Sequence, residues 1–276
     1  MRTPERTVLQ LSDPHLVAEE SGADVRLALA LQTVRLSGLR PDAILLTGDL
    51  SDDGSPESYV RIRAAVDPLA AELGAPVIAI PGNHDLGDAF RDGILDGEPL
   101  HRAVTVDGLR IVGLDTTVPG RPHGELGAGQ LEWLDDVLAE PAKHGTLLAL
   151  HHPPIPTAHP MLGRIGLRDP DRLARVVKGK DVRMMVCGHA HAVAAGTLAG
   201  IPVWSAPALG VTSDPLPPVG QMRAWDDIGG LTRIDLVGDD TIATLVPLSS
   251  APTAVYDVAL AERLAWLDDL EAQDRR

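Results

Sequence analysis

The sequence predicts an α/β fold in which buried strands alternate with helices. The chain has 276 residues, of which 44% are hydrophobic, so it is long and apolar enough to bury a substantial core. Short runs of Val, Ile and Leu recur along the chain without polar alternation, which is typical of strands that helices cover on both faces. Stretches with helical spacing of apolar residues separate these runs.

The predicted elements follow one another in a regular order. The first series of strand, helix, strand, helix and strand occupies residues 8–11, 24–39, 43–47, 56–73 and 77–80. The second series occupies residues 110–114, 128–139, 146–150, 170–178 and 184–186. Several of the helices begin with Asp, Pro or Ser, which favour helix starts. Each series is therefore expected to contribute neighbouring parallel strands.

The last third of the chain differs from the rest in composition and in the strands that it predicts. Gly and Pro punctuate short strand-like segments, which are expected to form antiparallel meanders at residues 194–198, 202–206, 230–236 and 241–247. Residues 209–218 contain the run PLPP and predict a long loop near the site. An amphipathic helix is expected at residues 258–272, within a C-terminal helix and tail of residues 258–276. Because neither a disordered linker nor a repeat interrupts the chain, we expect residues 1–276 to form a single domain.

Composition limits the classes of function. Lys and Arg total 24 against 39 Asp and Glu, a net charge of −15, which disfavours binding to nucleic acids and weakens the hypothesis of a nuclease. A single cysteine, Cys187, excludes an internal disulfide and suits the reducing cytoplasm. No apolar run approaches the roughly 18 residues of a membrane span, and the N-terminus lacks a secretory signal. A cytoplasmic protein with a small-molecule partner is expected.

Polar residues gather where the predicted strands end. Five of the strands run directly into residues that commonly bind metals: Asp13, His15, Asp49, Asn83, His151, His189 and His191. Ligands of open α/β sheets bind outside the carboxyl ends of the strands, so these side chains are expected to converge. Six of the ten histidines lie in these five clusters, a concentration that favours a shared site over unrelated turns.

The mixture of side chains indicates the kind of metal. Carboxylate and amide oxygens together with neutral imidazoles suit Fe, Mn, Zn or Co rather than Ca or Mg. Seven ligands exceed the need of one tetrahedral ion, whereas two ions that share a bridging carboxylate would use them all. Gly48, Gly82 and Gly188 each precede a candidate ligand, where a residue without Cβ allows a sharp turn and close approach of the backbone.

These motifs, taken in order, resemble a known family. DPH, GDLSD, GNHD, HHPP and GHAH, spread over residues 9–191, resemble the calcineurin-like metallophosphoesterase superfamily and look most like the bacterial class III cyclic nucleotide phosphodiesterases. The resemblance implies the metallophosphoesterase fold, a four-layered αββα sandwich with two mixed β-sheets flanked by helices. It also implies a cofactor of two divalent or mixed-valent transition metal ions, with Fe, Mn or Zn as candidates.

The resemblance further implies a role for each site residue. The first metal would be held by Asp13, His15, Asp49 and His191. The second would be held by Asn83, His151, His189 and the bridging Asp49. His151 is the ligand of the pair because the family pattern is H-x-P; its neighbour His152 either faces the substrate or packs against the site. Asn83 and His84 would also contact the substrate.

Two residues are expected to serve the catalytic step. His84 would donate a proton to the leaving group, although it is also compatible with anchoring the phosphate. Asp52 would orient His84, the alternative being a cap for the helix that follows residue 56. Outside the motifs, His159 has the best prospect of touching the substrate, because it follows HHPP in a Pro-rich segment.

One departure from the wider family bears on the substrate. The Ser/Thr phosphatases of the superfamily have Arg where this chain has Asp53, so a phosphomonoester dianion would lose a clamp and meet a like charge. The expected function is hydrolysis of 3′,5′-cyclic nucleotides, cyclic AMP favoured, to 5′-monophosphates. Other small diesters, such as glycerophosphodiesters or 2′,3′-cyclic nucleotides, are the alternative, and a non-catalytic scaffold is a remote one. A homodimer is also compatible with the sequence.

Overall fold

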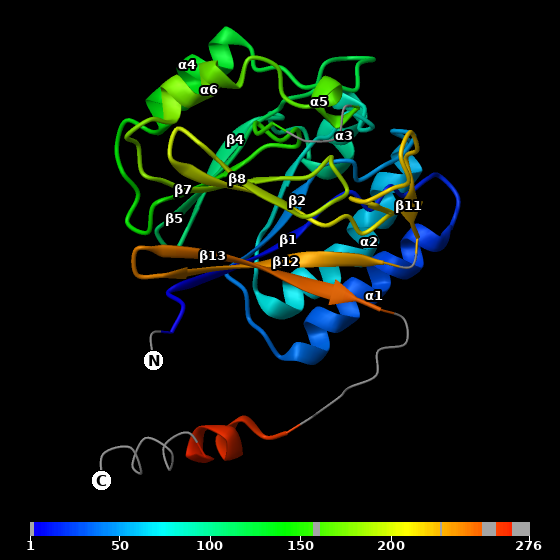
Figure 1. Cartoon of the computed structure of the whole chain (residues 1–276), viewed down its shortest axis with the longest axis vertical. Coiled ribbons are helices and arrows are strands. Elements are labelled where there is room, and N and C mark those ends of the chain that lie inside the picture. Colours follow the sequence, from blue (N-terminus) through cyan, green and yellow to red (C-terminus); the bar gives the residue numbers. More distant parts are fainter. Residues whose placement is uncertain (1–2, 157–160, 227, 250–257, 267–276) are drawn as a thin grey trace.

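The computed structural model describes residues 3–156, 161–226, 228–249 and 258–266. Two β-sheets face each other, and helices cover the outer face of each (Figure 1). The predicted α/β fold with four layers is confirmed. The continuously apolar runs of the sequence form the strands of the two sheets, and the amphipathic segments form the helices that cover them.

The first sheet has the strand order β13-β12-β1-β2-β3. Its parallel strands are β1 (Arg6–Leu11), β2 (Ala43–Thr47) and β3 (Val77–Ile80). Two antiparallel strands, β12 (Gly229–Val237) and β13 (Asp240–Leu248), extend it beyond β1. All five residues of β2 are buried, which explains why this strand has no polar alternation.

The second sheet has the order β4-β5-β6-β7-β9-β8. Its parallel strands are β5 (Leu109–Gly113), β6 (Thr146–Ala149), β7 (Val182–Cys187) and β9 (Ile201–Ser205). The antiparallel strands β4 (Arg102–Val106) and β8 (Ala194–Leu198) form its edges. The expectation of antiparallel meanders is confirmed for the hairpin of β8 and β9 and for that of β12 and β13; the parallel pairing of β9 with β7 was not predicted.

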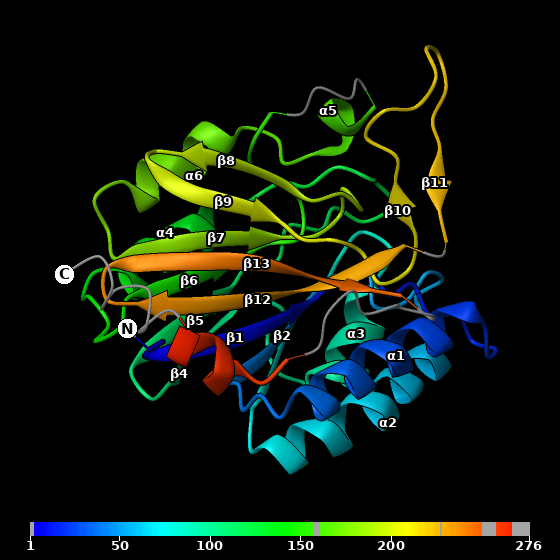
Figure 2. The same cartoon turned by 60° about the horizontal axis from the view of Figure 1, so that its bottom comes forward.

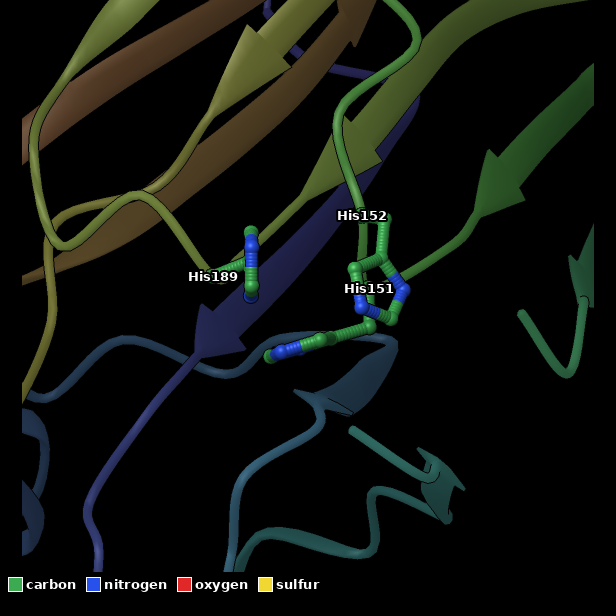
Figure 3. A group of neighbouring side chains, drawn as sticks. All are labelled: His151, His152 and His189. Atoms are coloured by element: carbon green, nitrogen blue, oxygen red, sulfur yellow. The ribbon is translucent and has the colours of Figure 1, made fainter. Parts of the chain in front are cut away.

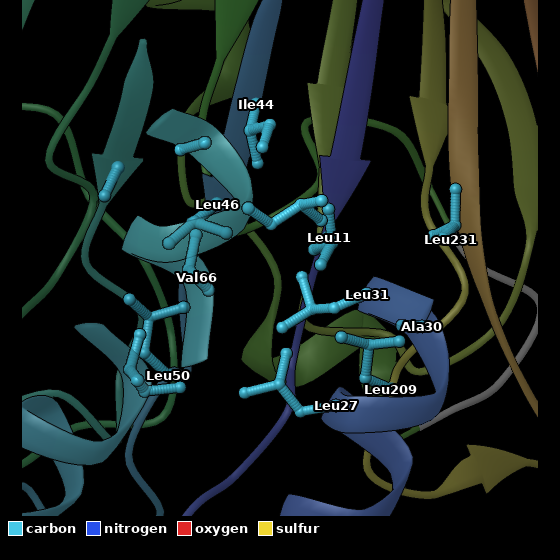
Figure 4. Packing of buried hydrophobic residues seen from close by; sticks show 14 of the residues in the cluster. Leu11, Leu27, Ala30, Leu31, Ile44, Leu46, Leu50, Val66, Leu209 and Leu231 are labelled. Atoms are coloured by element: carbon cyan, nitrogen blue, oxygen red, sulfur yellow. The ribbon is translucent and has the colours of Figure 1, made fainter. Parts of the chain in front are cut away.

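The outer helices pack on the two sheets separately (Figure 2). The first sheet is covered by α1 (Gly22–Ser37), α2 (Pro56–Leu73) and α3 (Gly87–Ile94). The second is covered by α4 (Ala128–Val137) and α6 (Pro170–Val177). Figure 4 shows Leu27 and Leu31 of α1 beside Leu11 of the first sheet. A third apolar cluster, which includes Leu45 and Leu147, lies between the sheets.

Local signals fix the helix ends. α1 begins earlier than predicted because Ser21 caps it: the Ala23 N–H donates to Ser21 Oγ, and Asp24 accepts from the Ser21 N–H. α2 has the predicted bounds, since Pro56 sits at its first position and Gly74 ends it in the left-handed region at φ 69°.

Several elements depart from the prediction. The segment 209–218 is not simply a loop, because β10 (Thr212–Ser213) pairs with β11 (Ala224–Trp225) in a short hairpin. Two residues per strand are too few to show alternation. The sequence also gave no indication of α3, β4 or the single turn α5 (Leu162–Ile165).

The C-terminal prediction is only partly testable. Residues 260–266 are helical, and residues 258–266 are all exposed; the rest of the predicted helix and tail, like His159, lies outside the described residues. In the part of the chain that the structure describes, no helix is long and apolar enough to cross a membrane.

Candidate metal centre

The candidate ligands meet at the carboxyl ends of strands from both sheets. Those from the first sheet follow β1, β2 and β3, and those from the second follow β6 and β7. The site therefore lies on a rim that the two sheets share, and not on the edge of one sheet as strand order alone suggested. Figure 3 shows His151 and His152 at the end of β6, with His189 opposite them after β7.

The first group of ligands is compact. Asp13, His15, Asp49 and His191 each offer an atom within 4.8 Å of the others. The Nε2 atoms of His15 and His191 are 3.0 Å apart, and His191 Nε2 lies 3.4 Å from Asp13 Oδ1. His15 Nε2 is 3.6 Å from Asp49 Oδ2. Two carboxylates and two imidazoles thus converge on one point.

The second group adjoins the first through Asp49. His151, His152 and His189 offer ring nitrogens within 4.8 Å of one another. His151 Nε2 lies 3.3 Å from Asp49 Oδ2, the same oxygen that faces His15. Asp49 Oδ2 thus lies between the His15 imidazole of the first group and the His151 imidazole of the second. This is the position that a ligand shared by two ions would take.

Asn83 completes the second group. It lies between Gly82, which packs against Asp49 and His151, and His84, whose N–H donates to Asp49 Oδ1 at 2.9 Å. Its Oδ1 is buried and has no hydrogen-bond partner among the described residues. The same is true of the Nε2 atoms of His151 and His189. Buried polar atoms normally find partners, and these three are atoms that bind transition metals, so the residues present fit such a cofactor.

Hydrogen bonds set the tautomers of two candidate ligands. His151 Nδ1 lies 2.9 Å from the Thr47 carbonyl oxygen, which only accepts, so the proton is on Nδ1. His15 Nδ1 donates in the same way to Asp52 Oδ1 at 2.8 Å. Both rings therefore turn Nε2 toward the site, the arrangement that outer partners give to metal-binding histidines.

Burial and mutual charge shift the pKa values in the site. Burial raises the pKa of Asp49, but the charge of the neighbouring His151 lowers it more, and the carboxyl is held well below its usual range. Burial lowers the pKa of His151, but Asp49 raises it to about 9. Burial and the charge of His151 lower the pKa of His189 to about 3. The neutral His189 is ready to bind a cation, whereas His151 holds a proton that a cation would replace.

A chain of buried hydroxyl groups lies behind Asp13. Ser12 Oγ donates to Asp13 Oδ2 at 2.5 Å, Thr47 Oγ1 donates to Ser12 Oγ at 2.7 Å, and Gln10 Nε2 donates to Thr47 Oγ1 at 3.0 Å. The His189 N–H donates to Asp13 Oδ1 at 2.9 Å. Both oxygens of this carboxylate are therefore held in place from behind.

The backbone at the site is unusual. Asp13, His15, Asp49, His189 and His191 have φ between 48° and 69°, a region that non-glycine residues adopt at a cost and that is enriched at functional sites. A Cβ on Gly82 would collide with Asp49 and His151, and one on Gly188 would collide with Ser12 and Asp13. A Cβ on Gly48, whose φ is 88°, would collide with His151 and Gly82, so the expected need for glycine before the ligands is confirmed at all three positions.

Comparison with known proteins agrees with this geometry. Residues 6–193 match the family model described as Calcineurin-like phosphoesterase. The chain belongs to the calcineurin-like phosphoesterase family. The predicted family resemblance and the assignment to its hydrolases are thus confirmed, and family members use divalent metal ions.

Named relatives of this phosphoesterase include two kinds of cyclic nucleotide enzyme. It is 42% identical over 260 residues to a cAMP/cGMP dual specificity phosphodiesterase from Mycobacterium tuberculosis, covering 91% of this chain and 82% of that protein. It is 36% identical to a 3′,5′-cyclic adenosine monophosphate phosphodiesterase from Escherichia coli, covering 67% of this chain and 69% of that protein.

A solved structure supports the fold of this phosphoesterase. A dimetal phosphatase from Danio rerio superposes with a TM-score of 0.64 at 15% identity, covering 90% of this chain and all of that one.

His84 and Asp52 form a third cluster in the phosphoesterase site, together with His15. His84 Nδ1 donates to the Asp52 carbonyl oxygen at 2.9 Å and lies 3.3 Å from its carboxylate. The same carboxylate accepts from His15. Asp52 thus contacts both the candidate proton donor and a candidate metal ligand. The alternative interpretation of Asp52 as a helix cap is wrong, because the N-cap of α2 is Ser55.

His152 lies deeper than the other site histidines of this phosphoesterase. It is fully buried, its Nδ1 is 2.7 Å from Thr116 Oγ1, and a Cβ on Gly124 would strike its ring. Burial lowers its pKa well below the usual value. These contacts favour packing over substrate contact, and its expected role as a substrate-binding residue stays a prediction.

Asp85 is a site residue that the sequence analysis did not single out, although it ends the GNHD motif. Its carboxylate accepts from the N–H groups of Gly82, Leu50 and Ser51 at 2.9 to 3.2 Å, and from Tyr59 Oη at 3.1 Å. Burial, followed by the charge of Asp49, raises its pKa to about 7. Asp85 ties the segment after β3 to the segment after β2, and so fixes two candidate ligands relative to each other.

Proposed function

We propose that this phosphoesterase uses two transition metal ions, Fe, Mn or Zn, to hydrolyse 3′,5′-cyclic nucleotides, with cyclic AMP favoured, to 5′-monophosphates. The observation that supports two ions best is the position of Asp49 Oδ2, 3.6 Å from His15 Nε2 and 3.3 Å from His151 Nε2. Asp13, His15, Asp49 and His191 would hold one ion. Asn83, His151, His189 and Asp49 would hold the other.

The chain's own residues supply the remaining chemistry. When bound, such a pair of ions supplies Lewis acidity, which activates water and offsets the charge that develops on the phosphoryl oxygens. His84 Nδ1–H donates a hydrogen bond to the Asp52 carbonyl oxygen, so in the imidazolium form the proton on Nε2 is the one that would pass to the departing 3′ oxygen. Its side chain is 42% exposed, as expected of a group that meets substrate. The backbone N–H of His84 meanwhile holds Asp49 in place.

The charge of Asp53 supports the expectation of a diester over a monoester. Asp53 Oδ1 accepts from Ser51 Oγ and from the Ser55 N–H, both at 3.0 Å. These bonds, those of Ser55 first, lower its pKa to about 2, so the carboxylate is charged at neutral pH. A negative charge in place of an arginine clamp disfavours a phosphate dianion more than a singly charged diester.

The names of the relatives favour a cyclic nucleotide among the diesters. Both named relatives are cyclic nucleotide phosphodiesterases, whereas neither name mentions glycerophosphodiesters. The cytoplasmic location and a small-molecule partner, expected from the sequence, belong to the same proposal; a single domain and a homodimer stay predictions.

Steady-state kinetics with a substrate panel tests the proposal. We expect Mn²⁺-dependent turnover that chelation abolishes and added Mn²⁺ restores, with kcat/KM higher for 3′,5′-cyclic AMP than for 2′,3′-cyclic AMP or glycerophosphocholine. Asp49→Ala should abolish turnover and weaken both metal sites, while Asp88→Asn, at a carboxyl that is 91% exposed, should change neither. A strong preference for glycerophosphocholine would overturn the substrate, and turnover that needs no metal would overturn the mechanism.

A further inference from the structure

A cavity of about 290 Å³ opens beside the second group of ligands. His189 contributes to its wall. The other walls come from segments that directly continue the ligand-bearing ones: Pro153 and Ile155 follow His151, and Ala192 follows His191. A group joined to a phosphate at the metal centre would have this cavity next to it.

Part of the cavity wall comes from β10 and from the segment that joins it to β11: Ser213, Asp214, Pro215, Met222 and Arg223. The Ser213 N–H donates to the His191 carbonyl oxygen at 2.8 Å, which anchors the hairpin to a candidate ligand. Met222, from the segment between β10 and β11, lines the cavity together with Met161 and Leu162. The hairpin that the sequence analysis treated as a loop is therefore a structural wall of this cavity.

The lining is mostly apolar and includes a few polar groups. Ile155, Leu162 and the two methionines supply flexible or branched apolar surface, and methionine sulfur packs well against flat rings. Ser205 and Ser213 add hydroxyl groups, and Arg223 pairs with Asp214, the Nε to Oδ2 distance being 2.6 Å. Because this ion pair is internally neutralised, the cavity suits an uncharged group with apolar faces and a polar edge.

These properties discriminate between the diesters considered above. A glycerol substituent is rich in hydroxyl groups and has no apolar face to bury. A choline substituent is a cation that aromatic cages recognise, yet no Trp, Tyr or Phe is among the described residues that line the cavity. A nucleobase is neutral and flat, and its polar atoms lie at its edge. The volume also accommodates one such ring system rather than a large ligand.

We propose that this cavity receives the nucleobase of the substrate, with Met161, Met222 and Ile155 against its faces and the serines and Arg223 near its edge. The inference rests on the proposed function and adds to it the residues that set substrate preference. Binding energy gained at the base, remote from the phosphate, would then appear in kcat/KM.

The test compares two substrates that differ only in the base. One is 3′,5′-cyclic AMP, and the other is the 3′,5′-cyclic phosphate of 1-deoxyribose, which has no base. Ala194→Trp should fill the cavity and lower the ratio of kcat/KM for cyclic AMP to that for the base-free substrate, by about tenfold to a hundredfold. Thr197→Trp, on the same strand but outside the lining, is the matched control and should leave the ratio at its wild-type value.

A second variant keeps the test independent of folding. Met222 is 60% exposed, so Met222→Ala should leave the thermal midpoint unchanged and still reduce the ratio. If the wild-type enzyme hydrolyses both substrates equally well, or if Ala194→Trp and Met222→Ala leave the ratio unchanged, the cavity is not the base site, although the proposed function stands. If it hydrolyses neither substrate with metal present, the proposed function itself fails.

Discussion

A substitution at Ser12 measures how strongly a residue that bonds to a candidate ligand affects the affinity of the site for metal. Its hydroxyl donates to Asp13 Oδ2 at 2.5 Å and accepts from Thr47. Ser12→Ala removes the bond to the carboxylate and leaves the Thr47 hydroxyl without its acceptor. Ser12 and Thr47 are both 0% exposed, so water has no access to replace the lost hydroxyl.

The size of the effect follows from the charge of the acceptor. A hydrogen bond to a charged group contributes about 1.5–3 kcal/mol, and each ~1.4 kcal/mol corresponds to a tenfold change in affinity. We therefore expect the metal site that contains Asp13 to bind about tenfold to a hundredfold more weakly, the usual range for partners of metal ligands. The site formed by Asn83, His151 and His189 should keep its affinity, because its ligands do not contact Ser12.

Competition against a chromophoric chelator, with Mn²⁺ or Zn²⁺, measures both affinities. Thr7→Ala is the matched control: Thr7 lies at the other end of β1, and its hydroxyl donates to the buried Asp235 carboxylate at 2.7 Å. It should lower the free energy of unfolding but not metal affinity. The reasoning is refuted if Ser12→Ala retains both wild-type affinities, or if Thr7→Ala weakens metal binding as much as Ser12→Ala does.

Three further predictions concern the ligands and their neighbours. His84→Ala should lower kcat by about 10²–10⁴-fold while elemental analysis still finds two ions per chain; loss of an ion would make His84 a ligand. Gly82→Ala should lose metal and turnover because its Cβ would collide with Asp49 and His151, whereas Gly127→Ala, with open space around it, should lose neither. Since the pKa of His151 is raised to about 9, it is protonated below that pH and its proton competes with the metal. Apparent affinity should therefore rise about tenfold per pH unit toward pH 9 and then level off, with proton release detected by calorimetry in buffers of different ionisation enthalpy; affinity that is flat with pH would contradict this.

The parts of the fold that could be predicted are those that depend on local sequence. β2 is continuously apolar because both of its faces are covered, so its bounds could be taken directly from the sequence. α2 is delimited by a proline and a glycine that act within their own turns. The candidate ligands could be located because they come directly after such strands. The need for glycine before them could be predicted because the turns there are crowded.

The parts that could not be predicted depend on tertiary contacts. α3 is short and contains two glycines, and it is held by Phe90, which is fully buried and meets the Tyr59 ring edge to face at 5.8 Å. β4 does alternate between half-buried and exposed residues, a weak signal over five positions. The hairpin of β10 and β11 depends on its bond to His191, which joins segments that the sequence gives no reason to pair.

The candidate metal centre is shaped by hydrogen bonds between protein atoms, because the segments that carry the candidate ligands are bonded to one another directly. The Asp13 N–H donates to the Gly48 carbonyl and the His15 N–H to the Asp49 carbonyl, both at 3.1 Å, which joins the segments after β1 and β2. The Gly188 N–H donates to the His151 carbonyl at 3.1 Å and joins the segments after β6 and β7. Asp85 links the segments after β3 and β2, and the His189 N–H links the two sheets through Asp13. The segments that carry the candidate ligands are therefore joined by one continuous series of hydrogen bonds. A cation would therefore meet ligands already in position, and little of its binding free energy would be spent on ordering the chain.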